Sequence, residues 1–288
     1  MLLTIFTPTY NRQNQLLRLY ESLKKQDNRD FEWLIIDDGS KDDTALLVES
    51  FIEEQKISIR YVKQKNSGKH VAYNTALKYS KGKFFFCIDS DDWMEDDFIS
   101  SFVDKIEDLD ANGFIAYKKN SYGKLLSEKF PSEIEESSLF DLQETYGCIG
   151  EFSIIIKNDI AKEYRFPVFE GEKFVTESVI YDQIGKKYKF RLLNQVATVC
   201  EYQEDGLTAN CNLLMKYNPT GFCLYFMQRV DLVHGFVQKI CMAGKYHCFR
   251  SLSKKDKLKY MGKNKILVFL TKPLGSVFLL YYKLIRGF

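Results

Sequence analysis

Residues 84–93 read FFFCIDSDDW, an apolar run that ends in a cluster of carboxylates. Residues 84–88 are apolar at every position, and so is the run WLII at residues 33–36. Strands without a polar face are typical of a parallel sheet that helices cover on both sides. The stretch therefore predicts a buried strand that carries its acidic residues to the edge of an α/β sheet.

Alternating strand and helix patterns extend outward from this stretch. We expect strands over residues 2–7, 31–36, 57–62 and 84–88, and helices over residues 13–25, 41–55 and 70–79. Beyond residue 110 the pattern loosens, with strands expected over residues 114–117, 152–156 and 196–202 and a helix over residues 176–186. Short connections between alternating elements imply parallel strands and right-handed crossovers. The fold class is thus α/β, Rossmann-like, with a mainly parallel sheet flanked by helices.

Composition allows a large core and divides the charge unevenly. The chain has 288 residues, of which 45% are hydrophobic and 28% are charged, and this excludes global disorder. Residues 1–210 hold 27 Lys and Arg against 37 Asp and Glu, whereas residues 211–288 hold 14 against two. Seven cysteines occur without a C-x-x-C pair, which disfavours a zinc site and a disulfide framework. Together with the lack of a basic leader at the first residues, this predicts a cytoplasmic location.

Three polar turns are expected to meet at one edge of the sheet. They read TPTYNR at residues 7–12, DDGS at residues 37–40 and DSDD at residues 89–92. In parallel sheets, ligands bind beyond the carboxyl ends of the strands, which is where these turns lie. The chain has neither a G-x-G-x-x-G segment nor a P-loop, so a dinucleotide fold and a P-loop enzyme are disfavoured.

Asp89, Asp91 and Asp92 form a candidate site for a hard divalent cation such as Mg²⁺ or Mn²⁺. The alternative is helix capping, with Asp92 as the N-cap and Glu95 three residues later. Capping explains one or two of the acids, but three in four residues after an apolar strand favour the metal site.

The DDGS turn has two readings as well. Ser40 and Asp43 resemble a capping box for the helix that follows. Capping leaves Asp37 and Asp38 without a structural role, and a carboxylate at this position can accept the N3–H of a uracil ring. Tyr10 offers a surface on which a base can stack, although an aromatic residue after a strand can equally serve packing.

Four segments in this order resemble the GT-A-fold, family 2 inverting glycosyltransferases: TPTYNR at 7–12, IIDDGS at 35–40, NSGK at 66–69 with Asn74, and IDSDDW at 88–93. The resemblance covers about residues 1–110. It implies a metal-dependent, inverting hexosyltransferase that moves a sugar from a nucleoside diphosphate donor, expected to be UDP, to a hydroxyl. The expected acceptor is a glycan or a lipid-linked precursor in surface polysaccharide biosynthesis.

The resemblance also implies roles for single residues. Asp91 is the expected direct ligand of Mn²⁺ or Mg²⁺, with Asp89 as its partner. Asp92 is an alternative ligand, because the DSDD run can be aligned in two ways. The residues expected to bind the nucleotide-sugar are Pro8, Thr9, Tyr10, Arg12, Asp38, Lys69, Asp89 and Ser90.

The family's catalytic base lies in a Glu-Asp pair at the start of a helix in the second half of the domain. The best match is GEKFVTES at residues 171–178, where Ser178 stands in place of the Asp. Glu177 is therefore the expected base, with Glu170 and Glu172 as alternatives. Thr176 can cap this helix, whose positive end would keep Glu177 ionised.

We expect three regions: residues 1–110 as the nucleotide-sugar half of the GT-A domain, 111–210 as its acceptor half, and 211–288 as a basic helical extension. Residues 266–285 are apolar enough to suggest a membrane span, but Lys272 and Pro273 interrupt them. A central Lys costs about 2.5–3.5 kcal/mol on insertion scales. We therefore expect a helix that lies in an anionic membrane interface. A helical cap on the protein's own core is the alternative, and the apolar content disfavours a nucleic-acid partner.

Two other functions are compatible with the pattern. A sugar nucleotidyltransferase also needs an α/β domain and acidic metal ligands, but usually opens with a Gly-rich basic loop in place of TPTYNR. An inactive, membrane-associated module that binds nucleotide-sugars is favoured by Ser178 alone. The expectation we carry forward is the glycosyltransferase, peripheral on the inner face of the cell membrane.

Overall fold

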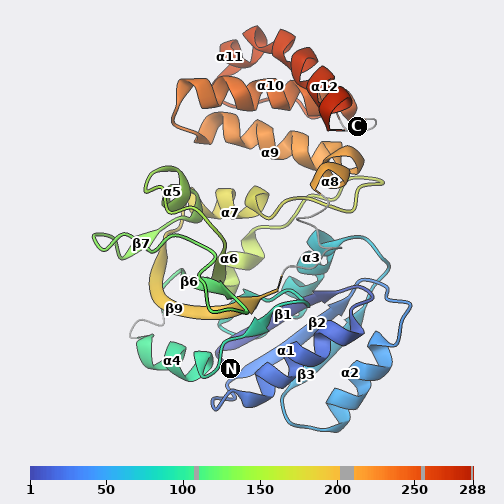
Figure 1. Cartoon of the computed structure of the whole chain (residues 1–288), viewed down its shortest axis with the longest axis vertical. Helices are drawn as coiled ribbons and strands as arrows, with labels where there is room; N and C mark the ends of the chain where they lie inside the picture. The colour runs from blue at the N-terminus through green and yellow to red at the C-terminus, as the bar shows by residue number, and fades with distance from the viewer. Residues whose placement is uncertain (107–109, 202–210, 254–256, 287) are drawn as a thin grey trace. The chain divides into compact units, whose positions relative to one another are not determined.

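The computed structural model describes residues 1–106, 110–201, 211–253, 257–286 and 288. The chain divides into two compact units (Figure 1). The first comprises residues 1–165 and 181–202, and the second comprises residues 166–180 and 203–288. The first unit is a mixed α/β structure and the second is built from helices, as the sequence predicts.

The described residues of the first unit form a nine-stranded sheet with the order β3-β2-β1-β4-β8-β6-β9-β5, and β7 pairs with β9. Strands β1 to β4 are parallel to one another, β8 is antiparallel to β4 and β6, and β6 is parallel to β9. The strands are β1 Leu3–Thr9, β2 Phe31–Asp37, β3 Ile59–Lys63, β4 Phe84–Cys87, β5 Trp93–Met94, β6 Gly113–Asn120, β7 Glu136–Ser137, β8 Phe152–Lys157 and β9 Phe190–Cys200.

Helices cover both faces of the parallel half of the sheet. Helices α1, α2 and α4 share one core with β1, β2 and β4, in which the rings of Tyr20, Trp33 and Phe51 all contact one another. Helix α3 covers the opposite face, where Tyr73 meets Phe6 and Phe85. The helices around this sheet are α1 Gln13–Lys25, α2 Thr44–Glu53, α3 Lys69–Tyr79, α4 Phe98–Lys105, α5 Leu139–Glu144, α6 Asn158–Glu163 and α7 Ser178–Gly185.

Strands β1 and β9 are longer than predicted at one end, and the short strands β5 and β7 were not predicted. Strand β1 runs through Pro8 to Thr9, because the missing N–H of Pro8 faces the side of β4, whose pairing has already ended opposite Phe6. Strand β9 begins at Phe190 and not at residue 196, since its first residues pair with β6 across two register shifts that disguise the pattern. Residue 202, the predicted last residue of that strand, lies outside the described residues.

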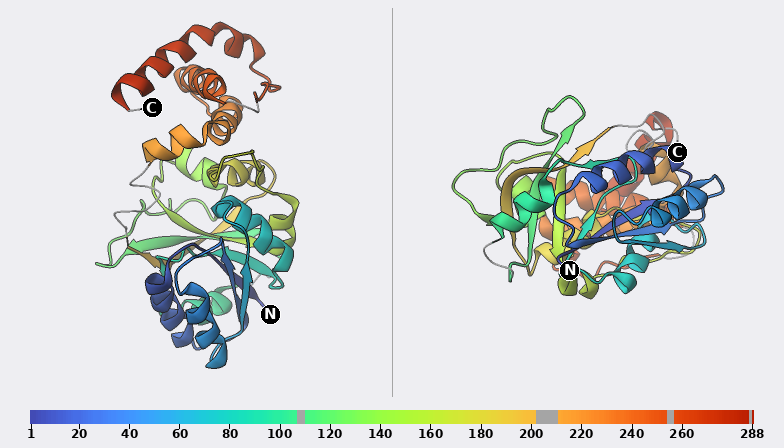
Figure 2. Two further views of the ribbon diagram at one scale, coloured as in Figure 1. Left: turned by 90° about the vertical axis from the view of Figure 1, so that its right-hand side faces the viewer. Right: turned by 90° about the horizontal axis from the view of Figure 1, so that it is seen from below.

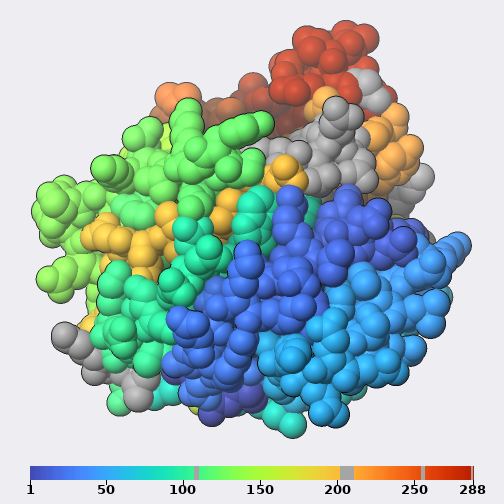
Figure 3. All heavy atoms as spheres, turned by 60° about the horizontal axis from the view of Figure 1, so that its bottom comes forward, coloured from blue at the N-terminus to red at the C-terminus, as the bar shows by residue number. Residues whose placement is uncertain are grey.

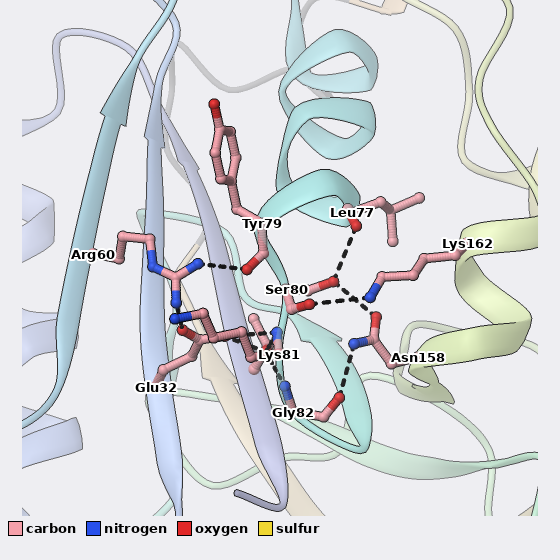
Figure 4. Close-up of polar contacts among 10 residues, drawn as sticks. Glu32, Arg60, Leu77, Tyr79, Ser80, Lys81, Gly82, Asn158 and Lys162 are labelled. Atoms are coloured by element: carbon pink, nitrogen blue, oxygen red, sulfur yellow. Dashed lines mark hydrogen bonds and ion pairs between the residues drawn. The ribbon is translucent and has the colours of Figure 1, made fainter.

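A buried acid ties together the amino ends of β1, β2 and β3 (Figure 4). Glu32 is 2% exposed and accepts hydrogen bonds from Thr4 at 2.7 Å and from the Lys81 amide at 2.9 Å. Its other oxygen pairs with Arg60 at 2.6 Å. Every oxygen of this carboxylate is therefore matched by a donor, which makes the buried charge tolerable.

A second set of polar contacts joins the turn between α3 and β4 to α6. Ser80 donates to Asn158 at 2.8 Å, and Asn158 in turn donates to the carbonyl of Gly82 at 2.8 Å (Figure 4). Lys162 reaches the carbonyl of Ser80 at 3.1 Å. Gly82 is required here, because a Cβ would lie 2.3 Å from the backbone nitrogen of Thr4 in β1.

The second unit has a core of its own. It contains α8 Cys211–Tyr217, α9 Pro219–Leu232, α10 Phe236–Leu252, α11 Lys265–Leu270 and α12 Lys272–Ile285. Helix α12 crosses over α10 (Figure 2), and Gly275 allows this close approach, because a Cβ there would lie 2.5 Å from the Cβ of His247. Tyr282 packs edge-on against Phe249 in the same core. Among the described residues, no helix combines the length and the apolar character that a membrane span needs.

We expect Glu32→Ala to destabilise the first unit by about 3 kcal/mol, because Thr4, Arg60 and the Lys81 amide would lose a buried acceptor. The two tryptophans of the chain, Trp33 and Trp93, both lie in this unit, so urea unfolding followed by tryptophan fluorescence reports on it. Glu49→Ala, at an exposed position of α2, should change the free energy of unfolding by less than about 0.5 kcal/mol. Equal stability of the two variants would show that the Glu32 cluster contributes nothing.

Candidate functional site

The three predicted turns lie together at the carboxyl ends of the parallel strands, as expected. The Asn11 amide donates to the Ser40 hydroxyl at 2.9 Å, and the Lys41 amide donates to the Asn11 side chain at 2.8 Å. These bonds join the turn after β1 to the turn after β2. The space-filling view shows the blue β1–α1 residues adjoining the lighter blue β2–α2 residues (Figure 3).

The first turn combines an exposed ring with buried polar groups. Tyr10 is 42% exposed, so its ring is open to a ligand, whereas Thr9 is 3% exposed. Pro8 and Arg12 are half-buried on either side of them. Of these predicted residues, Tyr10 is the one that presents a flat surface to solvent.

The acids of the second turn have structural roles that the sequence did not indicate. Asp37 is fully buried, accepts the Ser40 amide at 2.7 Å and bonds to the Tyr61 hydroxyl. The predicted capping box is wrong: α2 starts after Asp43, without a side-chain cap. The Ser40 hydroxyl is instead used by Asn11.

Asp38 organises the loop before α3. Its carboxylate accepts the amides of Ser67 at 2.8 Å and Gly68 at 2.7 Å, together with the Gln64 side chain at 2.8 Å. It is 5% exposed. A carboxylate has about four lone-pair positions, so these three donors leave capacity for one more hydrogen bond.

The loop held by Asp38 positions Lys69, the first residue of α3. Its ammonium lies 2.6 and 2.8 Å from the two oxygens of Asp89, directly after β4. Burial alone would raise the pKa of Asp89, but Lys69 and Lys118 outweigh it and hold this pKa below its usual value. The pair brings two predicted nucleotide-sugar residues into contact. Ser90, which follows Asp89, is 8% exposed.

Asp92 is paired with Lys118 of β6 at 3.1 Å, and both side chains are largely buried. Burial would lower the pKa of Lys118, but Asp92 and Asp89 raise it above its usual value, so the lysine stays charged. The capping alternative for Asp92 is therefore wrong, since α4 begins only at Phe98, after Asp97. Sequence reasoning missed Lys118. The one sequence feature that could have marked it is the pair of lysines at the end of an apolar strand pattern.

Asp91 is the acid of this run that no lysine neutralises. Burial raises its pKa, the neighbouring charges of Asp89 and Asp92 raise it further, and the charge of Arg12 lowers it only in part. In the described part of the chain, its carboxylate accepts no hydrogen bond from another side chain. A carboxylate that is strained by its neighbours and open to a ligand fits a hard divalent cation, which would relieve the repulsion. Within the described residues, no group of three or more His, Cys, Asp or Glu side chains is arranged as a complete metal cage. Protein oxygens there would thus supply part of the coordination, and phosphates or water the rest.

The candidate bases lie in the second unit. Glu177 is half-buried in the turn that immediately precedes α7, and its carbonyl accepts the Ile180 amide at 3.0 Å. Glu172 caps α9, because its two oxygens accept the Thr220 amide at 2.7 Å and the Gly221 amide at 2.8 Å. A carboxylate engaged in this way serves the helix, whereas Glu170 is exposed.

The C-terminal helices expose much apolar surface. Helix α12 buries Tyr282 and Gly275 against the unit's own core, but leaves Leu284 74% and Leu280 58% exposed. Helix α11 leaves Phe269 65% exposed. Among the described residues, this helix pair thus packs on the unit's own core with one face and exposes apolar side chains on the other, while the expected membrane role stays a prediction.

Comparisons with known proteins agree with this arrangement. The glycosyl transferase family 2 model matches residues 4–162. Glycosyltransferase GlyA of Streptococcus pneumoniae is 24% identical over 180 residues, which cover 58% of this chain and 26% of that protein. The GalNAc(5)-diNAcBac-PP-undecaprenol beta-1,3-glucosyltransferase of Campylobacter jejuni is 26% identical over 212 residues, 72% of this chain and 67% of that protein. The chain thus spans about a quarter of the length of the first of these relatives.

The fold is also that of a solved structure. The crystal structure of S. aureus TarS 1-349 in complex with UDP matches with a TM-score of 0.63 and 18% identity, over 98% of this chain and 90% of that chain. This likeness shows the fold class, GT-A, as the sequence predicts. Since the family model covers more than half of the residues, including all three turns of the site, the chain belongs to glycosyl transferase family 2.

Proposed function

We propose that this protein is an inverting glycosyltransferase that moves a sugar from a nucleoside diphosphate donor, UDP, to a hydroxyl of a glycan or lipid-linked acceptor. The observation that carries the proposal is the group of side chains at the carboxyl ends of β1, β2 and β4. It combines the exposed ring of Tyr10, the buried carboxylate of Asp38 and the carboxylate of Asp91, which pairs with no lysine among the described residues. The relatives' printed activities support the acceptor class.

In this proposal the donor nucleotide lies over the first two turns. Tyr10 stacks on the base, and Asp38 uses its remaining lone pair to accept the N3–H of uracil. Lys69 and Asp89 lie next to each other, so together they offer the sugar and phosphate oxygens both a cation and an acceptor. Pro8, Thr9, Arg12 and Ser90 complete the expected contacts.

Mn²⁺ or Mg²⁺ is held by Asp91 in this proposal, with Asp89 as the second ligand. Asp91 ranks first among the three candidate metal ligands, because Lys69 pairs with Asp89 and Lys118 pairs with Asp92. When bound, the metal ion supplies a positive charge that stabilises the departing diphosphate. Asp91 positions this charge at the end of β4.

Glu177 acts as the general base and takes the proton from the acceptor hydroxyl as that oxygen attacks the anomeric carbon. A single displacement of this kind inverts the anomeric centre. The capping role of Glu172 in α9 supports the choice of Glu177 over that alternative.

The C-terminal unit docks on an anionic membrane surface, which places the enzyme where lipid-linked acceptors occur, on the inner face of the cell membrane. Residues 211–288 hold 14 basic and two acidic residues. Apolar side chains on α11 and α12 are exposed beside these charges. Basic residues with exposed apolar side chains are typical of helices that lie in a membrane interface.

Asp91→Asn should abolish Mn²⁺-dependent binding of UDP and sugar transfer, because it removes the carboxylate that no lysine neutralises. Calorimetric titration of UDP with and without Mn²⁺ measures the effect. Asp96→Asn removes one exposed carboxylate five residues later and should leave UDP binding unchanged. Full activity of Asp91→Asn, or of the native protein in excess EDTA, contradicts the metal assignment.

Glu177→Gln keeps the shape of the side chain but removes its basicity, so turnover should fall by roughly 10²–10⁴-fold. Affinity for UDP should stay within about twofold, because the base acts on the acceptor. UDP release from UDP-sugars in the presence of acceptor measures turnover, and Glu170→Gln is the matched control. A parallel loss of UDP binding and turnover would count against Glu177 as the base. Absence of turnover in the native protein with every donor tested favours the inactive module.

Leu280→Glu/Leu284→Glu places two carboxylates on the exposed face of α12 and should reduce binding to anionic vesicles by at least about tenfold. Leu17→Glu/Leu46→Glu adds the same charge on exposed positions of α1 and α2 and serves as the control. Co-sedimentation with vesicles of phosphatidylglycerol and phosphatidylcholine measures binding. Truncation of the tail is a poor test, because removal of α12 would expose the core side chains against which it packs. Equal sedimentation of both variants contradicts the docking of α12.

A further inference from the structure

A cavity of about 580 Å³ lies within the second unit, lined by α10, α11, α12 and the segment before α11. Four of its lining residues are permanently basic: Arg250, Lys259, Lys265 and Lys272. His247 adds an imidazole, and none of the described lining residues is acidic. A concave surface that gathers cations in this way concentrates positive potential and favours an anion.

The behaviour of His247 agrees with this potential. Its Nε2 lies 2.6 Å from the carbonyl of Val268, an interaction that raises its pKa. Burial nevertheless lowers the pKa of His247, and the charges of Arg250 and Lys272 lower it further. Both basic side chains are thus near enough to this part of the cavity to repel a third positive charge.

Arg250 is held in place for a ligand. Its Nε donates to the carbonyl of Leu258 at 2.9 Å, and the Tyr246 hydroxyl donates to the same carbonyl at 3.0 Å. The two terminal nitrogens of Arg250 make no hydrogen bond within the described part of the chain. A guanidinium that is fixed through Nε can still bind two oxygens of one phosphate group with its terminal nitrogens.

Part of the lining is apolar. Val268, Phe269 and Leu279 share the cavity with the basic residues. Phe269 is also 65% exposed, so it connects the cavity to the exposed apolar side chains of α11 and α12. A free anion needs no such surface, whereas a phosphate that carries acyl chains would bury its apolar part there.

We propose that this cavity binds the phosphate of an anionic phospholipid headgroup, with the acyl chains directed to the exposed apolar side chains of α11 and α12. Arg250 binds two phosphate oxygens, and Lys265 and Lys272 neutralise the remaining charge. The inference rests on the membrane docking proposed above and names the headgroup site within it. Nucleotide binding in the first unit is independent of it.

The test uses the full chain and dihexanoyl phosphatidic acid as a soluble, monomeric probe, titrated by calorimetry. Lys265→Gln/Lys272→Gln should weaken its binding by about tenfold or more, because each lysine near an anionic group contributes about 1 kcal/mol. Lys239→Gln/Lys283→Gln removes the same charge outside the cavity lining and should bind the probe as the native protein does. Equal weakening in both variants would falsify the site, since it indicates only a diffuse charge effect.

A second variant and two competing ligands complete the test. Ser276→Glu puts a carboxylate at an exposed position of the lining and should also abolish probe binding. Inorganic phosphate bound as tightly as the lipid, or a single-stranded oligonucleotide bound more tightly, overturns the assignment to a lipid. UDP binding measured on the same samples should be native in every variant. Loss of the probe with retained UDP binding therefore separates failure at this cavity from failure of the glycosyltransferase proposal.

Discussion

Three carboxylates in four residues cannot all be ionised at the end of a buried strand unless positive charge is brought to them. The fold supplies two such charges from distant elements, Lys69 from the start of α3 and Lys118 from β6. Asp89 and Asp92 pair with these lysines and Asp91 pairs with neither, while burial and the neighbouring acids raise the pKa of both Asp91 and Asp92. The third charge is what a divalent cation would bring.

The positions of those two lysines depend on the sheet. Lys69 reaches Asp89 because Asp38, at the end of β2, holds the amides of Ser67 and Gly68 in the preceding loop. Lys118 reaches Asp92 because β6 is placed in the sheet by β8, which is antiparallel to it and to β4. At the opposite ends of the strands, the Glu32 carboxylate links β1, β2 and β3 through its contacts with Thr4 and Arg60. Substitutions far from the site can therefore change its charge balance without touching a ligand.

The sequence predicted the four parallel strands, the three helices between them and the meeting of three turns, because each depends on a local pattern and on a general rule for parallel sheets. It missed the short elements β5, β7, α4, α5 and α6. The sequence prediction was wrong where a side chain fits a local motif but forms a different, distant contact in the fold. Ser40 fits a capping box locally, but in the fold its hydroxyl accepts from Asn11, twenty-nine residues away in the chain. Asp92 fits an N-cap, yet pairs with Lys118 across the sheet. The sequence near Glu172 does not reveal its capping role, because the amide that it accepts belongs to Thr220 in α9. Such pairings are non-local, so no window of sequence contains both partners.

In the C-terminal helices, packing on a core and exposure of apolar side chains occur together. A glycine at 275 lets α12 approach α10 closely enough to bury Tyr282, so one face of the helix is fixed to the unit's own core. Because one face of α12 is packed, the opposite face cannot also turn toward the core. Leu280 and Leu284 therefore remain exposed to solvent. Exposed apolar side chains are unfavourable unless something covers them. Under the docking proposal, the surrounding lysines and arginines, with almost no acids among them, select a partner that is both apolar and anionic. A membrane interface meets both conditions, and a nucleic acid meets only the second.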